Sequence, residues 1–320
     1  MFRKQITRRK AIQTGAAIAL PLAAAASAAA DAAVAPPPRS VTVGLATLGF
    51  ANLTNSQLAA ELARHGVHTV QLFLNQADSR YWKYNGRSDV SDLSPQRCRA
   101  IADAYRSEGV SIHSMGVYTN LIHPDPTERK ANLAYFEAMM QVGRAMGVRT
   151  LVTEAGHYLA DKPAAVPYDF REDVWKTMVA TGKQLAALAE RHEVTVLFEA
   201  FYRGFFATAK RTRLFLQEVG SPRLRALLDP ANLLELNDLE EMFQQLGPWI
   251  DCLHAKDRKL HVDRGVPAGQ GDLDYRKFVA LAAEHAPHAP LILEYVGLAD
   301  YKQAMAHLQA AAQAVGVGTK

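Results

Sequence analysis

Short apolar runs alternate with longer amphipathic segments along most of this chain, starting at Val41. Apolar runs rich in β-branched residues are typical of buried strands, and apolar residues three and four positions apart are typical of helices. We predict strands at Val41–Leu48, Val67–Leu74, Val110–Val117, Arg149–Glu154, Val194–Glu199, Leu224–Asp229, Ile250–His254 and Leu291–Val296. We predict helices at Ser56–Arg64, Pro95–Glu108, Thr127–Met146, Arg171–Arg191, Thr208–Val219, Leu239–Leu246, Tyr275–Glu284 and Asp300–Ala314.

This alternation predicts an α/β protein with a single (β/α)₈ TIM barrel over residues 41–316. The strands are nearly continuous apolar runs, as expected when both faces of a parallel sheet are buried. The competing fold is an open, doubly wound sheet, which usually has a glycine-rich turn after its first strand. Here that turn reads ATLGFANLT and lacks the glycine pattern, so the barrel is favoured. We expect no second domain.

Four of the apolar runs end on a residue that can bind a metal or carry a proton. These residues are Glu199, Asp229, His254 and Glu294, at the ends of the fifth to eighth predicted strands. In a barrel the carboxyl ends of the strands converge on one mouth, where active sites lie. We therefore expect these four side chains to form one site.

A divalent cation is the simplest way to hold three carboxylates and an imidazole together. Buried carboxylates repel each other and are costly to desolvate without a counter-charge. An acidic residue at a strand end is more often a helix cap or an ion-pair partner, but the joint pattern favours a metal site. The oxygen-rich donor set favours one Mn²⁺ ion, or else Mg²⁺ or Co²⁺, and Zn²⁺ remains open.

The motifs around these residues resemble those of the xylose-isomerase-like barrels of the sugar phosphate isomerase/epimerase group, which includes ketose 3-epimerases and hydroxypyruvate isomerases. They are LLDPAN, HAKD, AGQGDLDY and NLIHPDPTER, and the resemblance runs from about Val41 to Ala314. It implies that Glu199, Asp229, His254 and Glu294 bind the metal.

The resemblance also implies proton transfer at a carbon beside a carbonyl, through an enediolate of a sugar. Glu199 and Glu294 would be the catalytic pair, one removing the proton and the other returning it. Arg203, Asn232 and Lys256 are candidate substrate contacts. Lys256 has a solvated loop lysine as its alternative, and Asn232 a structural turn after Pro230.

Further polar residues, Gln71 among them, lie near predicted strand ends. His113, Glu154 and His157 are candidate substrate contacts, although hydrogen-bonded core residues would look the same. The loop NQADSRYWKYNGRSD is long and aromatic, which is typical of a lid or binding loop. A contact in a homo-oligomer is its alternative use.

The chain departs from the ketose 3-epimerases at two points. After the fifth strand it reads EAFYRGFF, without the second glutamate of the epimerases, and Asn232 stands where many of them have histidine. Both departures weaken an epimerase acting on a free ketose and leave the metal site intact.

The first 30 residues read as a twin-arginine (Tat) signal peptide, with Arg8 and Arg9 followed by an Ala-rich apolar stretch from Ala11 to Ala26. Residues 31–40 read as a Pro-rich linker. We therefore expect a periplasmic protein exported by the Tat machinery. A single N-terminal anchor helix is the alternative, and the shortness of the apolar stretch disfavours it.

Removing this segment changes the charge. The chain has 36 Lys and Arg against 32 Asp and Glu, a net charge of +4, and five of its basic residues lie before residue 31 with no acidic residue among them. The remainder is near −1, which argues against a nucleic-acid partner. Its two cysteines, Cys98 and Cys252, fall in a predicted helix and a predicted strand, so no disulfide is expected.

The leading interpretation is a metal-dependent isomerase or epimerase of a non-phosphorylated sugar, because phosphorylated sugars are mostly cytoplasmic. The alternative uses the same proton abstraction in a lyase that eliminates a group from a 3-keto glycoside. An AP endonuclease shares the barrel but needs about three metals and further histidines. A non-catalytic sugar-binding barrel would be expected to lose at least one metal ligand, and all are present.

Overall fold

The computed structural model describes residues 39–160 and 162–320, within a compact unit that spans Pro38–Lys320. The predicted signal peptide and most of the predicted linker lie outside the described residues. No helix in the part of the chain that the structure describes combines the length and the apolar character needed to cross a membrane.

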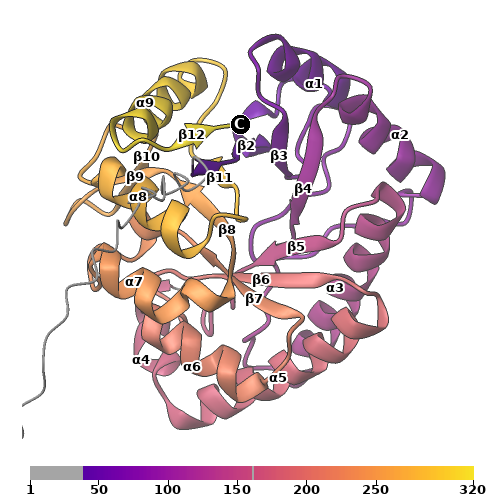
Figure 1. The fold of residues 1–320 in the computed structure, drawn as a ribbon. Coiled ribbons are helices and arrows are strands. Elements are labelled where there is room, and N and C mark those ends of the chain that lie inside the picture. Colours follow the sequence, from indigo (N-terminus) through magenta and orange to yellow (C-terminus); the bar gives the residue numbers. More distant parts are fainter. Residues whose placement is uncertain (1–38, 161) are drawn as a thin grey trace, which may run out of the picture. The chain divides into compact units, whose positions relative to one another are not determined.

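A closed, eight-stranded parallel barrel forms the centre of this unit (Figure 1). Its strands, in chain order, are β2 (Val43–Ala46), β3 (Thr69–Leu72), β4 (Ser111–Gly116), β5 (Thr150–Thr153), β6 (Thr195–Glu199), β7 (Leu224–Leu228), β8 (Ile250–Ala255) and β11 (Leu291–Leu293). Each strand pairs with the next one in this series, and β11 closes the barrel against β2. The predicted TIM barrel is confirmed.

Helices surround the barrel, and most lie within two residues of the predicted bounds (Figure 1). They are α1 (Asn55–Arg64), α2 (Pro95–Arg106), α3 (Pro126–Met146), α5 (Glu172–Arg191), α6 (Ala209–Val219), α7 (Leu239–Leu246), α8 (Tyr275–His285) and α9 (Tyr301–Ala314). Polar side chains start several of them by accepting a backbone N–H of the first turn, among them Thr54, Ser94, Asp125, Thr208, Asp238 and Asp274. The acidic ones among them, Asp125, Asp238 and Asp274, therefore have the helix-capping role that acidic residues often have.

Several short elements were not predicted. Helix α4 (Lys162–Asp169) follows β5, and a small antiparallel hairpin, β9 (Asp257–Lys259) and β10 (Arg264–Val266), follows β8. Strand β12 (Gly318–Thr319) pairs with β1 (Ser40–Val41), so ordered structure continues past the predicted limit at residue 316. Strands of two or three residues are too short to show a periodicity in the sequence.

The apolar core has two parts. The larger one lies between the barrel and its helices, and the smaller one fills the barrel. The members of the smaller part are Ala46, Phe73, Tyr118, Val152, Leu197, Leu227, Cys252 and Ile292. Both cysteines are buried and free, as expected. The filled interior leaves the carboxyl ends of the strands as the place for a site.

Candidate metal centre and substrate cavity

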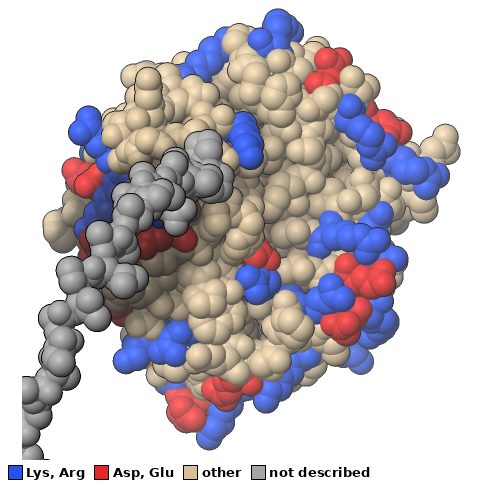
Figure 2. Space-filling model, in the orientation of Figure 1, with Lys and Arg blue, Asp and Glu red and all other residues tan. Residues whose placement is uncertain are grey.

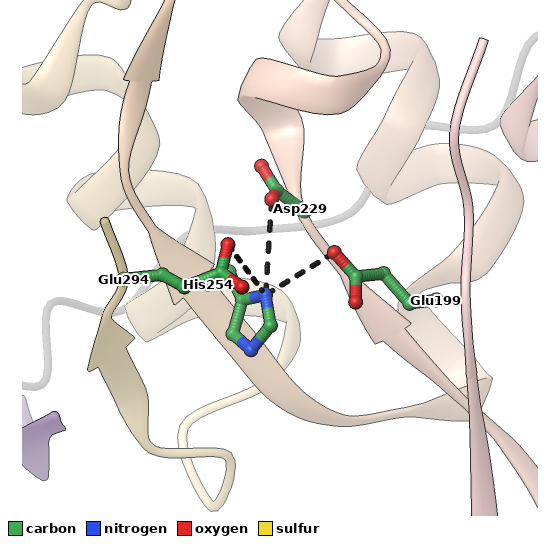
Figure 3. A group of neighbouring side chains, drawn as sticks. All are labelled: Glu199, Asp229, His254 and Glu294. Atoms are coloured by element: carbon green, nitrogen blue, oxygen red, sulfur yellow. Dashed lines mark hydrogen bonds and ion pairs between the residues drawn. The ribbon is translucent and has the colours of Figure 1, made fainter. Parts of the chain in front are cut away.

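The four predicted ligands meet at the carboxyl ends of consecutive strands. Glu199, Asp229, His254 and Glu294 each offer a donor atom, and these atoms all lie within 4.8 Å of one another. His254 is central, with its Nδ1 at 3.3 Å from Glu199, 3.7 Å from Asp229 and 3.5 Å from Glu294 (Figure 3). In this view the two glutamates approach the ring from opposite sides. All four residues are buried.

A glutamine holds the imidazole of His254 in a fixed orientation. His254 Nε2 lies 2.6 Å from Oε1 of Gln71 on β3, and since an amide oxygen only accepts, Nε2 is the donor. This leaves Nδ1 directed toward the carboxylates. Metal-bound histidines commonly donate their second ring nitrogen in this way, which fixes the ring for the ion.

Positive charge on the protein itself balances these carboxylates. Burial alone would raise the pKa of Glu199, but the charges of His254 and Lys256 outweigh it and hold that pKa below its usual value. Burial alone would lower the pKa of His254, but Glu294 and Glu199 raise it to about 10. The carboxylate cluster thus requires nearby cations, and a divalent ion would take over this role once Nδ1 lost its proton.

The donor set fits a hard or borderline divalent cation. Three carboxylates and one neutral imidazole would surround it, and the two cysteines of the chain are not among the group. Such a set is suited to Mn²⁺, Mg²⁺, Co²⁺ or Zn²⁺, and its composition does not select among them.

Two neighbours keep Glu199 ionised and in place. The Tyr118 hydroxyl donates to its Oε2 at 2.6 Å, and the Asn232 side-chain amide donates to its Oε1 at 2.8 Å. Hydrogen bonds to a carboxylate favour its charged form. Asn232 also lies in the short turn Pro230–Asn232, the structural role that was its alternative, and its contact with a substrate stays a prediction.

Lys256 is buried within the site, so the interpretation as a solvated loop lysine is wrong. Its Nζ lies 2.8 Å from Asp229 and 2.9 Å from Glu294. The HAKD and AGQGDLDY motifs position it together. Asp257 accepts the backbone N–H groups of Gly269 and Leu273, and Tyr275 donates its hydroxyl to the Lys256 carbonyl oxygen at 2.9 Å.

A cavity of about 840 Å³ lies at the site and is lined by two of the four predicted ligands, Glu199 and Glu294. One part of its wall is aromatic, formed by Phe73, Trp82, Tyr84 and Tyr118. Trp82 and Tyr84 belong to the long loop after β3, which the sequence marked as a lid or binding loop. Polar and aromatic groups together give a surface suited to a sugar.

Four of the predicted substrate contacts line this cavity: Arg203, Glu154, Asn232 and Lys256. Arg203 is half exposed and forms an ion pair with Asp263 at the β9–β10 hairpin. Glu154 accepts a hydrogen bond from the Tyr84 hydroxyl at 2.8 Å. His157 Nε2 lies 3.0 Å from the same hydroxyl. His157 thus contacts a residue of the cavity wall without lining the cavity itself.

His113 is the exception, because it lies away from the mouth. It occupies the third position of β4, at a register irregularity between β3 and β4, and it interacts with Asp251 at the start of β8. Burial lowers its pKa. His113 does not line the cavity, because it lies in the middle of β4 and not at its carboxyl end.

Several site residues were not singled out as such from the sequence. They are Gln71, Tyr118, Arg258, Asp263 and Tyr295. Tyr118 and Tyr295 each lie two residues after the end of a strand. A search for polar or aromatic residues just after each apolar run could therefore have found them. Arg258 and Asp263 lie on the unpredicted hairpin, which carried no such signal.

On the face drawn in Figure 2, basic and acidic side chains are interspersed around the edge. This face therefore presents no continuous basic surface of the kind that binds a phosphate backbone.

The family described as "Xylose isomerase-like TIM barrel" matches residues 59–311 of the chain. The match covers most of the barrel and all four predicted metal ligands. The chain belongs to this family. The expected resemblance is thus confirmed at the level of the family.

Known relatives of this xylose isomerase-like barrel include sugar epimerases. The "Probable L-ribulose-5-phosphate 3-epimerase UlaE" of Mycoplasma pneumoniae is 19% identical over 232 residues, which are 70% of this chain and 71% of that protein. Two solved structures share the fold. D-psicose 3-epimerase from Clostridium cellulolyticum H10 has a TM-score of 0.63 and 16% identity, over 86% of this chain and 98% of its own. The probable 3-DHS dehydratase AsbF from Bacillus anthracis has a TM-score of 0.68 and 18% identity, over 84% and 98%.

Proposed function

We propose that this protein is a divalent-metal-dependent isomerase or epimerase of a non-phosphorylated sugar or sugar derivative. The observation that carries the proposal is the group of three carboxylates around Nδ1 of His254, with Nε2 bound to Gln71. Of the relatives named above, the two epimerases support the same class of enzyme.

The residues of the site would divide the work as follows. Glu199 and Glu294 approach the centre from opposite sides, so one can remove a proton from carbon and the other can return it to the opposite face. The electron pair left on carbon passes to the neighbouring carbonyl oxygen of the sugar. Lys256, whose pKa lies well above its usual value because the surrounding carboxylates outweigh burial, stays charged and can donate a hydrogen bond to that oxygen.

A divalent ion bound by the four ligands would polarise the carbonyl and stabilise the negative charge that develops there. Aromatic residues around the cavity would exclude water and hold the apolar face of the sugar.

The test is deuterium exchange. The protein is stripped of metal, reloaded with Mn²⁺, Mg²⁺, Co²⁺ or Zn²⁺, and incubated in D₂O with D-psicose, D-tagatose, D-fructose and a methyl 3-keto-glucoside. We expect metal-dependent deuterium uptake at carbon beside the carbonyl of at least one sugar, measured by NMR. Exchange with none of them under any metal would contradict the proposal.

A lyase acting on 3-keto glycosides is the second candidate. The cavity volume of about 840 Å³ is near the upper end of the range for ligand sites, roughly 300–1,000 Å³, and has room for more than one sugar ring. In this reaction a glutamate removes the proton beside the ketone, the bond from carbon to the glycosidic oxygen breaks, and the departing alcohol takes up a proton. Methanol released from the methyl 3-keto-glucoside would identify the lyase, whereas a rearranged intact glycoside would identify the epimerase.

A further inference from the structure

Tyr295 has an unusual backbone for a bulky residue. Its φ is +57°, in the left-handed region, where side chains with a Cβ are strained. Four other non-glycine residues of the described chain share a positive φ: Asn85, Glu193, His261 and Asp263. Asn, Asp and His adopt this region most readily. Glu193 adopts it where helix α5 ends, because Val194 there donates back to Ala189 in a helix-terminating turn.

Neither explanation applies to Tyr295. It is a tyrosine, and it follows strand β11 and the ligand Glu294 instead of ending a helix. Burial does not offset the strain either, because the residue is 57% exposed. Strained residues persist where surrounding structure holds them, and they cluster at functional sites.

The strained backbone changes where the side chain points. In an extended strand, successive side chains point to opposite faces, so a residue after Glu294 would point outward to the helices. In the left-handed conformation Glu294 and Tyr295 both line the cavity. The turn thus adds an aromatic ring to the mouth directly beside a metal ligand.

Two contacts hold the ring in place and leave the residue 57% exposed. Lys256 Nζ lies 4.5 Å from the ring centroid, a cation–π contact. The ring also lies flat on the backbone of Gly265 in β10, where a Cβ would come within 2.6 Å of it. Only glycine at position 265 leaves room for this arrangement. The β9–β10 hairpin and Tyr295 therefore pack closely against each other at the cavity edge.

Resting on the proposed function, we infer that Tyr295 determines substrate specificity by offering its exposed face to a closed sugar ring, as in a glycoside. A pyranose has a face of C–H groups that can lie on an aromatic ring, whereas an open-chain sugar presents no such flat surface. The ring, and not the hydroxyl, is the recognising group. Tyr295 does not touch the transferred proton and is a binding residue.

The test compares Tyr295→Gly and Tyr295→Phe with the wild type. The control variant is Glu193→Gly, which relieves a left-handed residue outside the cavity. Each metal-loaded protein is titrated with methyl β-D-glucopyranoside, a closed ring, and with D-sorbitol, an open-chain polyol, by calorimetry and NMR. Thermal unfolding of each variant is recorded in parallel.

We expect Tyr295→Gly to weaken glucoside binding about tenfold without changing sorbitol binding, because the stacking surface is lost. Tyr295→Phe and Glu193→Gly should bind the glucoside like the wild type. The melting temperature of Tyr295→Gly should equal or exceed that of the wild type, since glycine relieves the strain, and a merely structural role would lower it.

Equal glucoside binding by wild type and Tyr295→Gly would overturn the inference, as would a wild type that binds no glucoside. Deuterium exchange by the wild type tests the proposed function separately. Exchange with an open-chain ketose but not with any closed ring would leave the function standing and remove this specificity.

Discussion

His254 lies at the centre of the site because one strand and one hydrogen bond fix both ends of its ring. Strand β8 brings it between Glu199 and Glu294, and Gln71 binds the far nitrogen. The ring is fully buried, so it has little freedom to turn away. Because its position is fixed in this way, replacing His254 is the simplest test of whether the site binds a metal ion.

Replacing His254 with Ala should therefore remove most of the bound metal and leave the barrel folded. One divalent ion per chain is expected in the wild type, and well below one in the variant, by elemental analysis after gel filtration. His288→Ala, at an exposed histidine, is the matched control. Full metal occupancy in His254→Ala with an unchanged circular dichroism spectrum would contradict the assignment of this ligand.

The predicted role of Glu199 and Glu294 in proton transfer should be separable from their predicted role as metal ligands. In Glu199→Gln and Glu294→Gln the amide oxygen can still coordinate a metal but cannot accept a proton. Each change should lower the rate of deuterium exchange by about 10²–10⁴, the usual effect of losing a positioned acid or base.

The measurement is exchange into a turned-over sugar by variants with confirmed metal content. Glu241→Gln, at a half-buried glutamate in the first turn of α7 that does not line the cavity, is the control. Wild-type exchange rates in both metal-loaded site variants would place the base elsewhere, with Glu154 as the next candidate lining the cavity.

Among the secondary-structure elements, α4 ends on an unusual residue. The Asp169 side chain is fully buried, and neither of its oxygens has a hydrogen-bond partner among the described residues. Burial raises the pKa of Asp169 to about 7, and Arg211 only partly opposes this. An unfolded aspartate titrates near 3.9. The folded state thus binds the proton more tightly than the unfolded chain.

The sign of the pH dependence follows from this difference. The contribution of Asp169 to the free energy of unfolding is most favourable below about pH 4 and is lost as the pH rises toward 7. Asp169→Asn removes this loss. It should therefore raise the free energy of unfolding more at pH 8 than at pH 5, by about 1–3 kcal/mol after allowing for relaxation.

Chemical denaturation at the two pH values measures this difference. Any effect of the amide on the free energy of unfolding that does not depend on pH cancels between the two pH values. The remaining difference reports the titration of Asp169. Asp103→Asn, at an exposed aspartate in α2, should show no such change with pH. An equal effect of Asp169→Asn at both pH values would show that Asp169 does not titrate in this range.

At the scale of the whole molecule, closure of the barrel brings the residues of the site together. Parallel strands around a closed barrel all end at the same mouth, so residues separated by up to 95 positions in sequence, Glu199 and Glu294, become neighbours. The β9–β10 hairpin and the long loop after β3 then cover this mouth from different sides.

The cellular location of the protein stays a prediction from the sequence. Arg8 and Arg9 precede an Ala-rich apolar stretch, as in a twin-arginine signal. Replacing both with Lys should leave the protein in the cytoplasm, because the Tat machinery requires the arginine pair. Cell fractionation followed by immunoblotting measures this, with Arg3→Lys as the control. Unchanged export of the double variant would reject this route.

The sequence by itself determined the barrel, its eight strands and the meeting of the four predicted ligands. The reason is that these features depend on local pattern: apolar runs define strands, glycines end helices, and polar residues stand where Glu199, Asp229, His254 and Glu294 leave the core. Strand order in a barrel follows chain order, so the convergence of strand ends needed no further information.

Only the tertiary structure decided which other residues reach the site. His113 lies in the middle of both the predicted strand, Val110–Val117, and the observed one, Ser111–Gly116, and only the structure shows that it does not line the cavity. Gln71 was noted as a polar residue near a strand end, but its contact with His254 depends on which side of the strand faces the centre. Tyr295 lines the cavity because of a left-handed backbone that no periodicity predicts, and that conformation is held by contacts with a hairpin distant in sequence. Local pattern therefore determines where the chain leaves the core, whereas packing between distant segments determines what each side chain then touches.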